Sequence, residues 1–150
     1  MNKKAFTFIE MVIVITIFAV SLGLFTLYSQ TSQVRSDLNS QRDVFVSYLR
    51  LAQSDSASGK DSESHGIHLA ESYYAVFVGD AYVEGGSGNI SIELPDSLIF
   101  TNINLNGGGE DIIFDSPFGE TDEYGTVDLF SEQTNKTSQI TINSLGLINF

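Results

Sequence analysis

The feature that most constrains this chain is an uncharged apolar stretch near its N-terminus. Residues 11–28 include no Asp, Glu, Lys or Arg, and Arg35 is the next charged residue. A helix rises about 1.5 Å per residue, so this stretch would extend roughly 27 Å, close to the roughly 30 Å hydrocarbon core of a bilayer. The sequence therefore predicts a membrane-spanning helix.

Charges beside this stretch predict its orientation in the membrane and indicate that it has a partner. Lys3 and Lys4 precede it, and basic residues next to a first apolar segment stay in the cytoplasm, so the rest of the chain is expected outside. Glu10 stands at the start of the stretch. A carboxylate costs about 2.5 to 3.5 kcal/mol at the bilayer centre, less near the interface, and usually has a partner.

Several interpretations of Glu10 and its apolar stretch remain open. A simple anchor gains nothing from the carboxylate, and an acidic residue at this junction is unfavourable in a secretory signal cut near Ser21. The side chain could also reach the lipid headgroups by snorkelling.

The residues around Glu10 carry a specific resemblance. Residues 3–5 (Lys-Lys-Ala) and 6–10 (Phe-Thr-Phe-Ile-Glu), followed by an apolar helix, resemble the prepilin signature of type IV pilins and type II secretion pseudopilins. The resemblance implies cleavage by a prepilin peptidase between Ala5 and Phe6, methylation of the Phe6 amine, and an assembly role for Glu10. The family usually has Gly before the cut, so Ala5 is a departure. In a filament, the Phe6 amine of a neighbouring subunit would compensate the carboxylate.

The helical pattern continues beyond the apolar stretch. Six apolar residues at helical spacing form one stripe: Val34, Leu38, Phe45, Tyr48, Leu49 and Ala52. Such a stripe predicts a helix packed on a globular head. The composition shifts to Ser, Asp, Gly and Lys after Ser54, so the helix should end between Ser54 and Gly59, about 80 Å from its start.

The remainder of the chain has the pattern of short strands. Eight runs rich in β-branched and aromatic residues, separated by Gly- and Pro-containing turns, occupy residues 66–69, 73–78, 90–94, 98–101, 112–114, 127–130, 139–142 and 147–150. They predict an antiparallel sheet with one face covered by the helix. The fold class is therefore α+β. Together with the prepilin resemblance, this implies a pilin-like chain divided into residues 1–5 (leader), 6–28 (membrane and filament-core helix), 29–58 (amphipathic helix) and 59–150 (head).

The head carries a second resemblance. Ile113-Phe114, Pro-Phe-Gly at 117–119, the runs at 127–129 and 140–142, and Gly146 are similar in order to minor pseudopilins of the GspH/FimT type. This implies a minor pilin or pseudopilin, partnered with other pilin subunits through the N-terminal helix, the prepilin peptidase, the inner-membrane assembly platform and the lipid membrane. It implies an inner-membrane, single-pass protein that later joins an extracytoplasmic filament.

Net charge argues against nucleic acid as a direct partner. The formal charge is −12, and no Lys or Arg lies between Lys60 and Lys136. Phosphate binding needs such cations. FimT-type proteins that bind DNA do so through basic residues near the C-terminus, and residues 144–150 contain none. A DNA-uptake or adhesive pilus, and an anchored binding module that never polymerises, remain alternatives to protein secretion.

We expect no enzyme and no cofactor. The chain has no cysteine, no nucleophile-elbow context and no phosphate-binding glycine loop. His65 and His68 would point to opposite faces of a strand, as ordinary strand-edge histidines. The acidic loop residues Asp115, Glu120, Asp122 and Glu123 could hold Ca²⁺ but match no EF-hand, and we favour a solvated loop.

Overall fold

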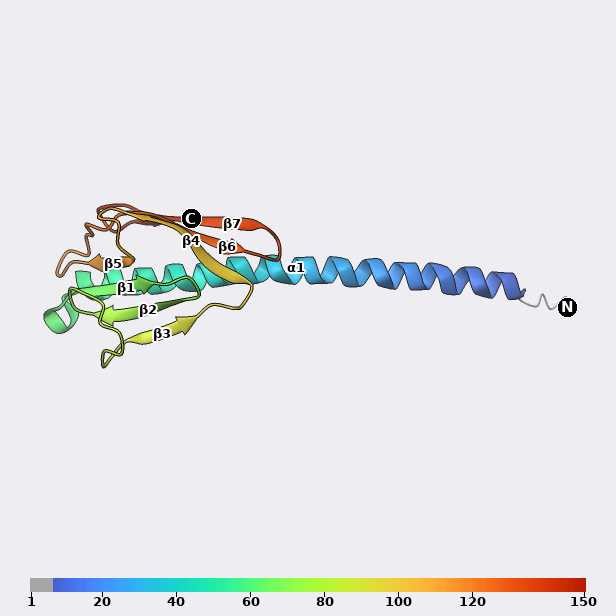
Figure 1. Cartoon of the computed structure of the whole chain (residues 1–150), viewed down its shortest axis with the longest axis horizontal. Coiled ribbons are helices and arrows are strands. Elements are labelled where there is room, and N and C mark those ends of the chain that lie inside the picture. The colour runs from blue at the N-terminus through green and yellow to red at the C-terminus, as the bar shows by residue number, and fades with distance from the viewer. Residues whose placement is uncertain (1–6) are drawn as a thin grey trace.

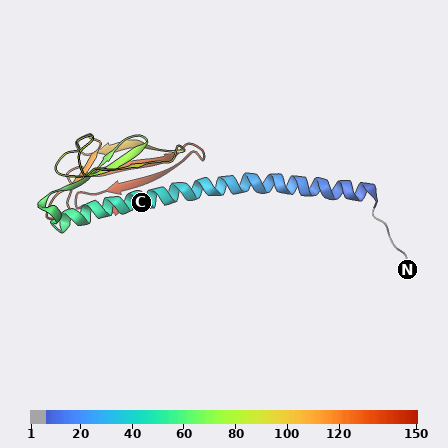
Figure 2. The same ribbon diagram turned by 90° about the horizontal axis from the view of Figure 1, so that it is seen from below.

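The longest element of the protein is a single helix. The computed structural model describes residues 7–150, except for the side chains of residues 26–36. Helix α1 (Phe8–Ala57) has 50 residues. Its first half extends beyond the rest of the molecule, and its second half lies along one side of the strands (Figure 1; Figure 2).

The C-terminal end of α1 lies where the sequence predicts it. The Ser58 amide donates to the Ser54 carbonyl at 2.9 Å. Gly59 then takes a left-handed φ of 68°, which glycine adopts without steric cost and which commonly ends helices. The predicted end between Ser54 and Gly59 is confirmed.

Eight strands follow a short 3₁₀ turn, η1 (Lys60–Ser62). They are β1 (His65–Leu69), β2 (Tyr73–Val78), β3 (Ile90–Glu93), β4 (Leu98–Leu105), β5 (Asp111–Phe114), β6 (Gly125–Ser131), β7 (Lys136–Ile142) and β8 (Ile148–Asn149). Each predicted run overlaps one of these strands. The α+β fold, with a long helix and antiparallel strands, is confirmed.

The strands form two sheets rather than one. The first has the order β3-β2-β1-β5 and the second β4-β6-β7-β8, and all pairs within them are antiparallel. Strand β5 pairs with β1, so that Ile112 lies opposite Ile67, whereas β4 pairs with β6 and places Phe100 opposite Leu129. Helix α1 contacts strands of both sheets (Figure 1).

Phe45 of α1 joins the helix to both sheets. Its side chain has no exposed surface. Its ring centroid lies 5.1 Å from that of Tyr74 on β2 and 5.0 Å from that of Phe100 on β4. The aromatic rings meet at tilted and edge-to-face angles, which are favourable for such pairs.

The predicted apolar stripe of α1 faces this core. Leu38, Phe45, Leu49 and Ala52 are buried, and Tyr48 is partly buried against them. Val34 lies outside the described side chains. The prediction that one helical face packs on the head is confirmed, because helical periodicity places these residues on one side whatever the head's topology.

The Tyr74 hydroxyl is buried in this core without a hydrogen-bond partner in the described part of the chain. Burial, and secondarily the charge of a nearby Tyr48 phenolate, raises the pKa of Tyr74 above its usual value. The folded protein therefore keeps this proton at alkaline pH values where the unfolded chain releases it. Stability should consequently fall as the pH rises above about 10.

We expect Tyr74→Phe to raise the free energy of unfolding at pH 7 by about 1 kcal/mol, because it keeps the ring and removes an unpaired buried hydroxyl. The same variant should lose less stability above pH 10. Urea unfolding of the full chain in detergent micelles, followed by circular dichroism, measures both effects. Tyr124→Phe, at a half-exposed tyrosine, is the matched control. A destabilised Tyr74→Phe protein would show instead that the hydroxyl is hydrogen-bonded in solution.

Candidate functional site

The first half of α1 is apolar and uncovered. The segment Phe8–Phe25 has a mean hydropathy of 2.5, and none of it is buried against the described part of the chain. Its large apolar side chains are between 41% and 86% exposed. Its length and composition are sufficient to cross a membrane. Because the core helix of a soluble protein would be covered by its own chain, we infer that lipid or other chains cover this segment.

The Thr16 hydroxyl and the helical backbone of this segment find hydrogen-bond partners within α1. The Thr16 hydroxyl donates to the Val12 carbonyl at 2.7 Å, and the backbone amides and carbonyls pair within the helix. In an apolar surrounding each unpaired polar group would cost several kcal/mol. The segment is therefore compatible with lipid along its length, and Glu10 is its single charged residue.

Glu10 lies in the first turn of α1. One of its carboxylate oxygens, Oε2, lies 3.5 Å from the Thr7 amide nitrogen, in the arrangement of a capping box. The positive end of the helix dipole favours a negative charge there. The contact is long for a hydrogen bond, and the side chain is exposed. The carboxylate is thus free to pair with an incoming cation.

The predicted processing residues, Ala5 and Phe6, lie outside the described residues. Comparison with family models settles what kind of N-terminus surrounds them: residues 1–26 match the prokaryotic N-terminal methylation motif. This chain has a pilin-type N-terminus. The motif supports a place in the superfamily of pilins and pseudopilins, and with it a structural subunit that interacts with other pilin subunits and with prepilin peptidase.

The match covers the pilin-type N-terminus and stops before the head. An N-terminal motif of this kind agrees with a membrane-anchoring role for the uncovered segment Phe8–Phe25. No curated protein and no solved structure matches the chain. These comparisons therefore assign no role to the head.

The four acidic residues of the loop that we expect to be solvated have separate surroundings. Glu123 accepts hydrogen bonds from the Ile113 amide at 3.3 Å and from the Thr121 hydroxyl at 3.2 Å. Asp115 and Glu120 are joined through their backbones, and Asp122 is exposed. Within residues 7–150, no group of three or more His, Asp or Glu side chains is placed to hold a metal ion.

The two histidines differ from the predicted pair of strand-edge residues. Both lie on β1, which is an inner strand between β2 and β5. His65 is buried, and neither ring nitrogen has a partner among the described residues. The Nδ1 atom of His68 lies 2.6 Å from an Asp111 carboxylate oxygen, and its ring stacks on Tyr82 at 4.0 Å. The strand-edge interpretation was wrong because pairing of β1 with β5 depends on residues more than 40 positions away.

Basic side chains gather at the C-terminus, a feature that the sequence did not predict. The guanidinium groups of Arg42 and Arg50 lie 4.8 Å and 5.6 Å from the ring centroid of Phe150. Arg42 also pairs with Asp43 at 2.8 Å. Residues 144–150 contain no Lys or Arg, so these cations reach the C-terminus only through the packing of α1 against the last strand. The two arginines are eight residues apart, which places them on the same side of a helix, and this spacing is the one sequence pattern that could have indicated the cluster.

Proposed function

We propose that this protein is a minor pilin or pseudopilin of the GspH/FimT type, which assembles into a type II secretion pseudopilus or a type IV pilus and has no catalytic activity. One observation carries the proposal. A single helix is uncovered and apolar over Phe8–Phe25 and packed on a head over its second half. A filament built from such helices buries their apolar halves together and leaves the heads outside.

The N-terminal residues supply the proposed assembly mechanism. Prepilin peptidase removes residues 1–5 by cutting between Ala5 and Phe6, and the Phe6 amine is methylated. Lys3 and Lys4 hold the N-terminus in the cytoplasm, so the head lies outside the inner membrane. The assembly platform then moves the subunit into the filament, where Glu10 pairs with the Phe6 amine of a neighbour. This pairing offsets the cost of a carboxylate in apolar surroundings.

We assign a different role to each half of α1 and to the head. Residues 6–28 anchor the subunit and then join the filament core, residues 29–58 hold the head, and residues 59–150 form that head. Helix α1 contains no proline, the usual cause of a sharp kink. A spine without proline supports a minor subunit, because many major pilins carry a proline kink.

The proposed processing is tested by the intact mass of the protein recovered from native membranes. We expect loss of residues 1–5 and gain of one methyl group, and both changes should require the prepilin peptidase. A strain without the peptidase is the control, and it should yield the full chain. An uncut chain in both strains, or one cut near Ser21, would contradict the proposal and leave an anchored or secreted binding module.

We propose further that the head uses no calcium. Glu123 is held by its own neighbours, and no three acidic side chains of the described residues lie together, so Ca²⁺ binding at Asp115, Glu120 and Asp122 would have to rearrange the loop. We expect the melting temperature of the full chain in detergent to change by less than about 1 °C between 1 mM EDTA and 2 mM CaCl₂. A rise of several degrees, lost in an Asp122→Asn variant, would establish a calcium site.

A further inference from the structure

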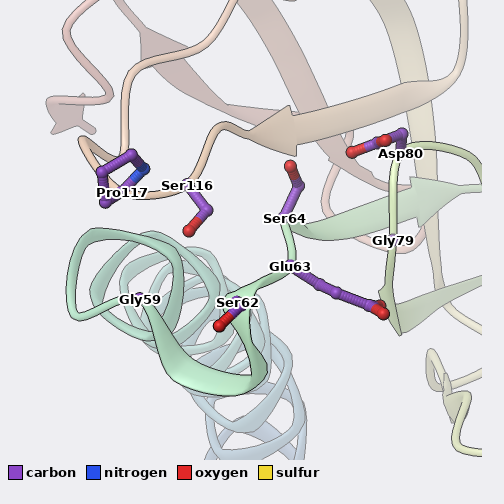
Figure 3. A pocket seen from close by; sticks show the side chains of 8 residues that line it. All are labelled: Gly59, Ser62, Glu63, Ser64, Gly79, Asp80, Ser116 and Pro117. Carbon is purple, nitrogen blue, oxygen red and sulfur yellow. The ribbon is translucent and has the colours of Figure 1, made fainter.

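The head contains a polar pocket at the end where α1 stops. Its volume is about 710 Å³, within the range of small-ligand sites. Three connections form its walls: the one from α1 to β1, the one from β2 to β3, and the one from β5 to β6 (Figure 3). The lining residues are Gly59, Ser62, Glu63, Ser64, Gly79, Asp80, Ser116 and Pro117.

The hydroxyl of a buried serine points into this pocket. Ser64 is only 8% exposed, and its hydroxyl makes no hydrogen bond within the described part of the chain. Figure 3 shows it directed toward the space between Ser116 and Asp80. The Ser64 carbonyl accepts from the Gly79 amide at 2.7 Å, which holds the two loops together. Although the residue is buried, its hydroxyl reaches the open space of the pocket and is therefore available to a ligand.

The charge of the pocket is also uncompensated. Glu63 and Asp80 line it, and neither forms an ion pair with any described residue. The adjacent cation, Lys60, is already bound to Asp55 at 2.6 Å. Ionised carboxylates only accept hydrogen bonds. The pocket therefore presents two carboxylates and several hydroxyls to a ligand that must supply donors and positive charge.

We propose that this pocket binds the guanidinium group of an arginine side chain presented by a partner protein. A guanidinium is always charged and carries five N–H donors in a planar fork, with no acceptor. It can reach carboxylates and hydroxyls on several loops at once, which the compact ammonium of lysine does less well. The inference concerns the head alone and stands whether or not the spine assembles.

The experiment is an NMR titration of the ¹⁵N-labelled full chain in detergent micelles at low ionic strength. The probe is N-acetyl-argininamide, and the control ligand is N-acetyl-citrullinamide, which has nearly the same shape without the charge. We expect saturable shifts of the Ser64, Gly79 and Asp80 amide signals with the arginine probe, and binding about tenfold weaker with citrulline. Because both carboxylates are exposed, added salt should weaken the arginine complex.

Substitutions of the lining residues test whether the arginine probe binds in this pocket. Asp80→Asn should weaken binding of the arginine probe about tenfold, and Glu63→Gln and Ser64→Ala several-fold each, with otherwise unchanged spectra. Asp96→Asn, at an exposed carboxylate on the turn after β3, is the matched control and should bind normally. Equal shifts with both ligands, or arginine binding that survives Asp80→Asn, would overturn the proposal. Shifts of the same amides by CaCl₂ and not by the arginine probe would also overturn it.

Discussion

Glu10→Ala should lower the amount of this subunit in purified filaments by at least about 100-fold, while its amount in the membrane stays unchanged. Removing one partner of an ion pair in apolar surroundings leaves the other charge uncompensated, which costs about 3 to 5 kcal/mol. Each 1.4 kcal/mol corresponds to a factor of ten. The anchor itself should be unaffected, since replacing Glu10 only makes the N-terminal part of the span more apolar. Immunoblots of the filament and membrane fractions measure the two amounts.

Glu10→Gln separates the proposed ion pair from the cap seen in the structure. The capping box places Oε2 of Glu10 near the Thr7 amide, and glutamine can serve in the same arrangement. The glutamine variant therefore keeps the helix start but loses the charge. We expect it to be excluded from filaments as strongly as the alanine variant.

Other results for Glu10→Ala and Glu10→Gln would assign a different role to Glu10. Normal incorporation of Glu10→Gln, with loss of Glu10→Ala, would assign Glu10 to helix capping alone. Full function of both variants would contradict the filament proposal and support an anchored module that does not polymerise. Intact masses of the membrane fraction establish that processing at Phe6 is unchanged in each variant.

Phe45→Ala should lower the free energy of unfolding of the head by about 3 to 5 kcal/mol, the range for truncating a buried phenylalanine. Phe45 has no exposed surface and touches one aromatic ring from each sheet, Tyr74 and Phe100. Its loss leaves a cavity where α1, β2 and β4 meet. Because domains of this size have only about 5 to 15 kcal/mol of stability, the head should be near unfolding at physiological temperature.

Urea unfolding of the full chain in detergent, followed by far-ultraviolet circular dichroism, measures this loss of stability. Val44→Ala is the matched control because Val44 is the preceding residue of α1 and is 41% exposed. It should change stability by less than about 0.5 kcal/mol. A cost below about 1 kcal/mol for Phe45→Ala would mean that the two sheets hold together without this side chain.

Local patterns were enough to predict most of the secondary structure. The stripe that includes Leu38, Phe45 and Leu49 predicted the buried face of α1, because helical periodicity depends only on near neighbours in the chain. Gly59 marked the helix end for the same reason. The N-terminal motif is likewise contiguous, so Glu10 and its apolar helix could be recognised from residues side by side in the sequence.

What the sequence determined by itself is therefore the spine, the strands and the pilin-type N-terminus, all of which are set by short-range periodicity, capping and hydropathy. Only the tertiary structure decided how strands pair into two sheets, since β1 joins β5 across more than 40 residues. The same long-range pairing buried His65 and brought Ser64, Asp80 and Ser116 from three loops to one pocket. Such contacts depend on packing between distant segments, which no local pattern records.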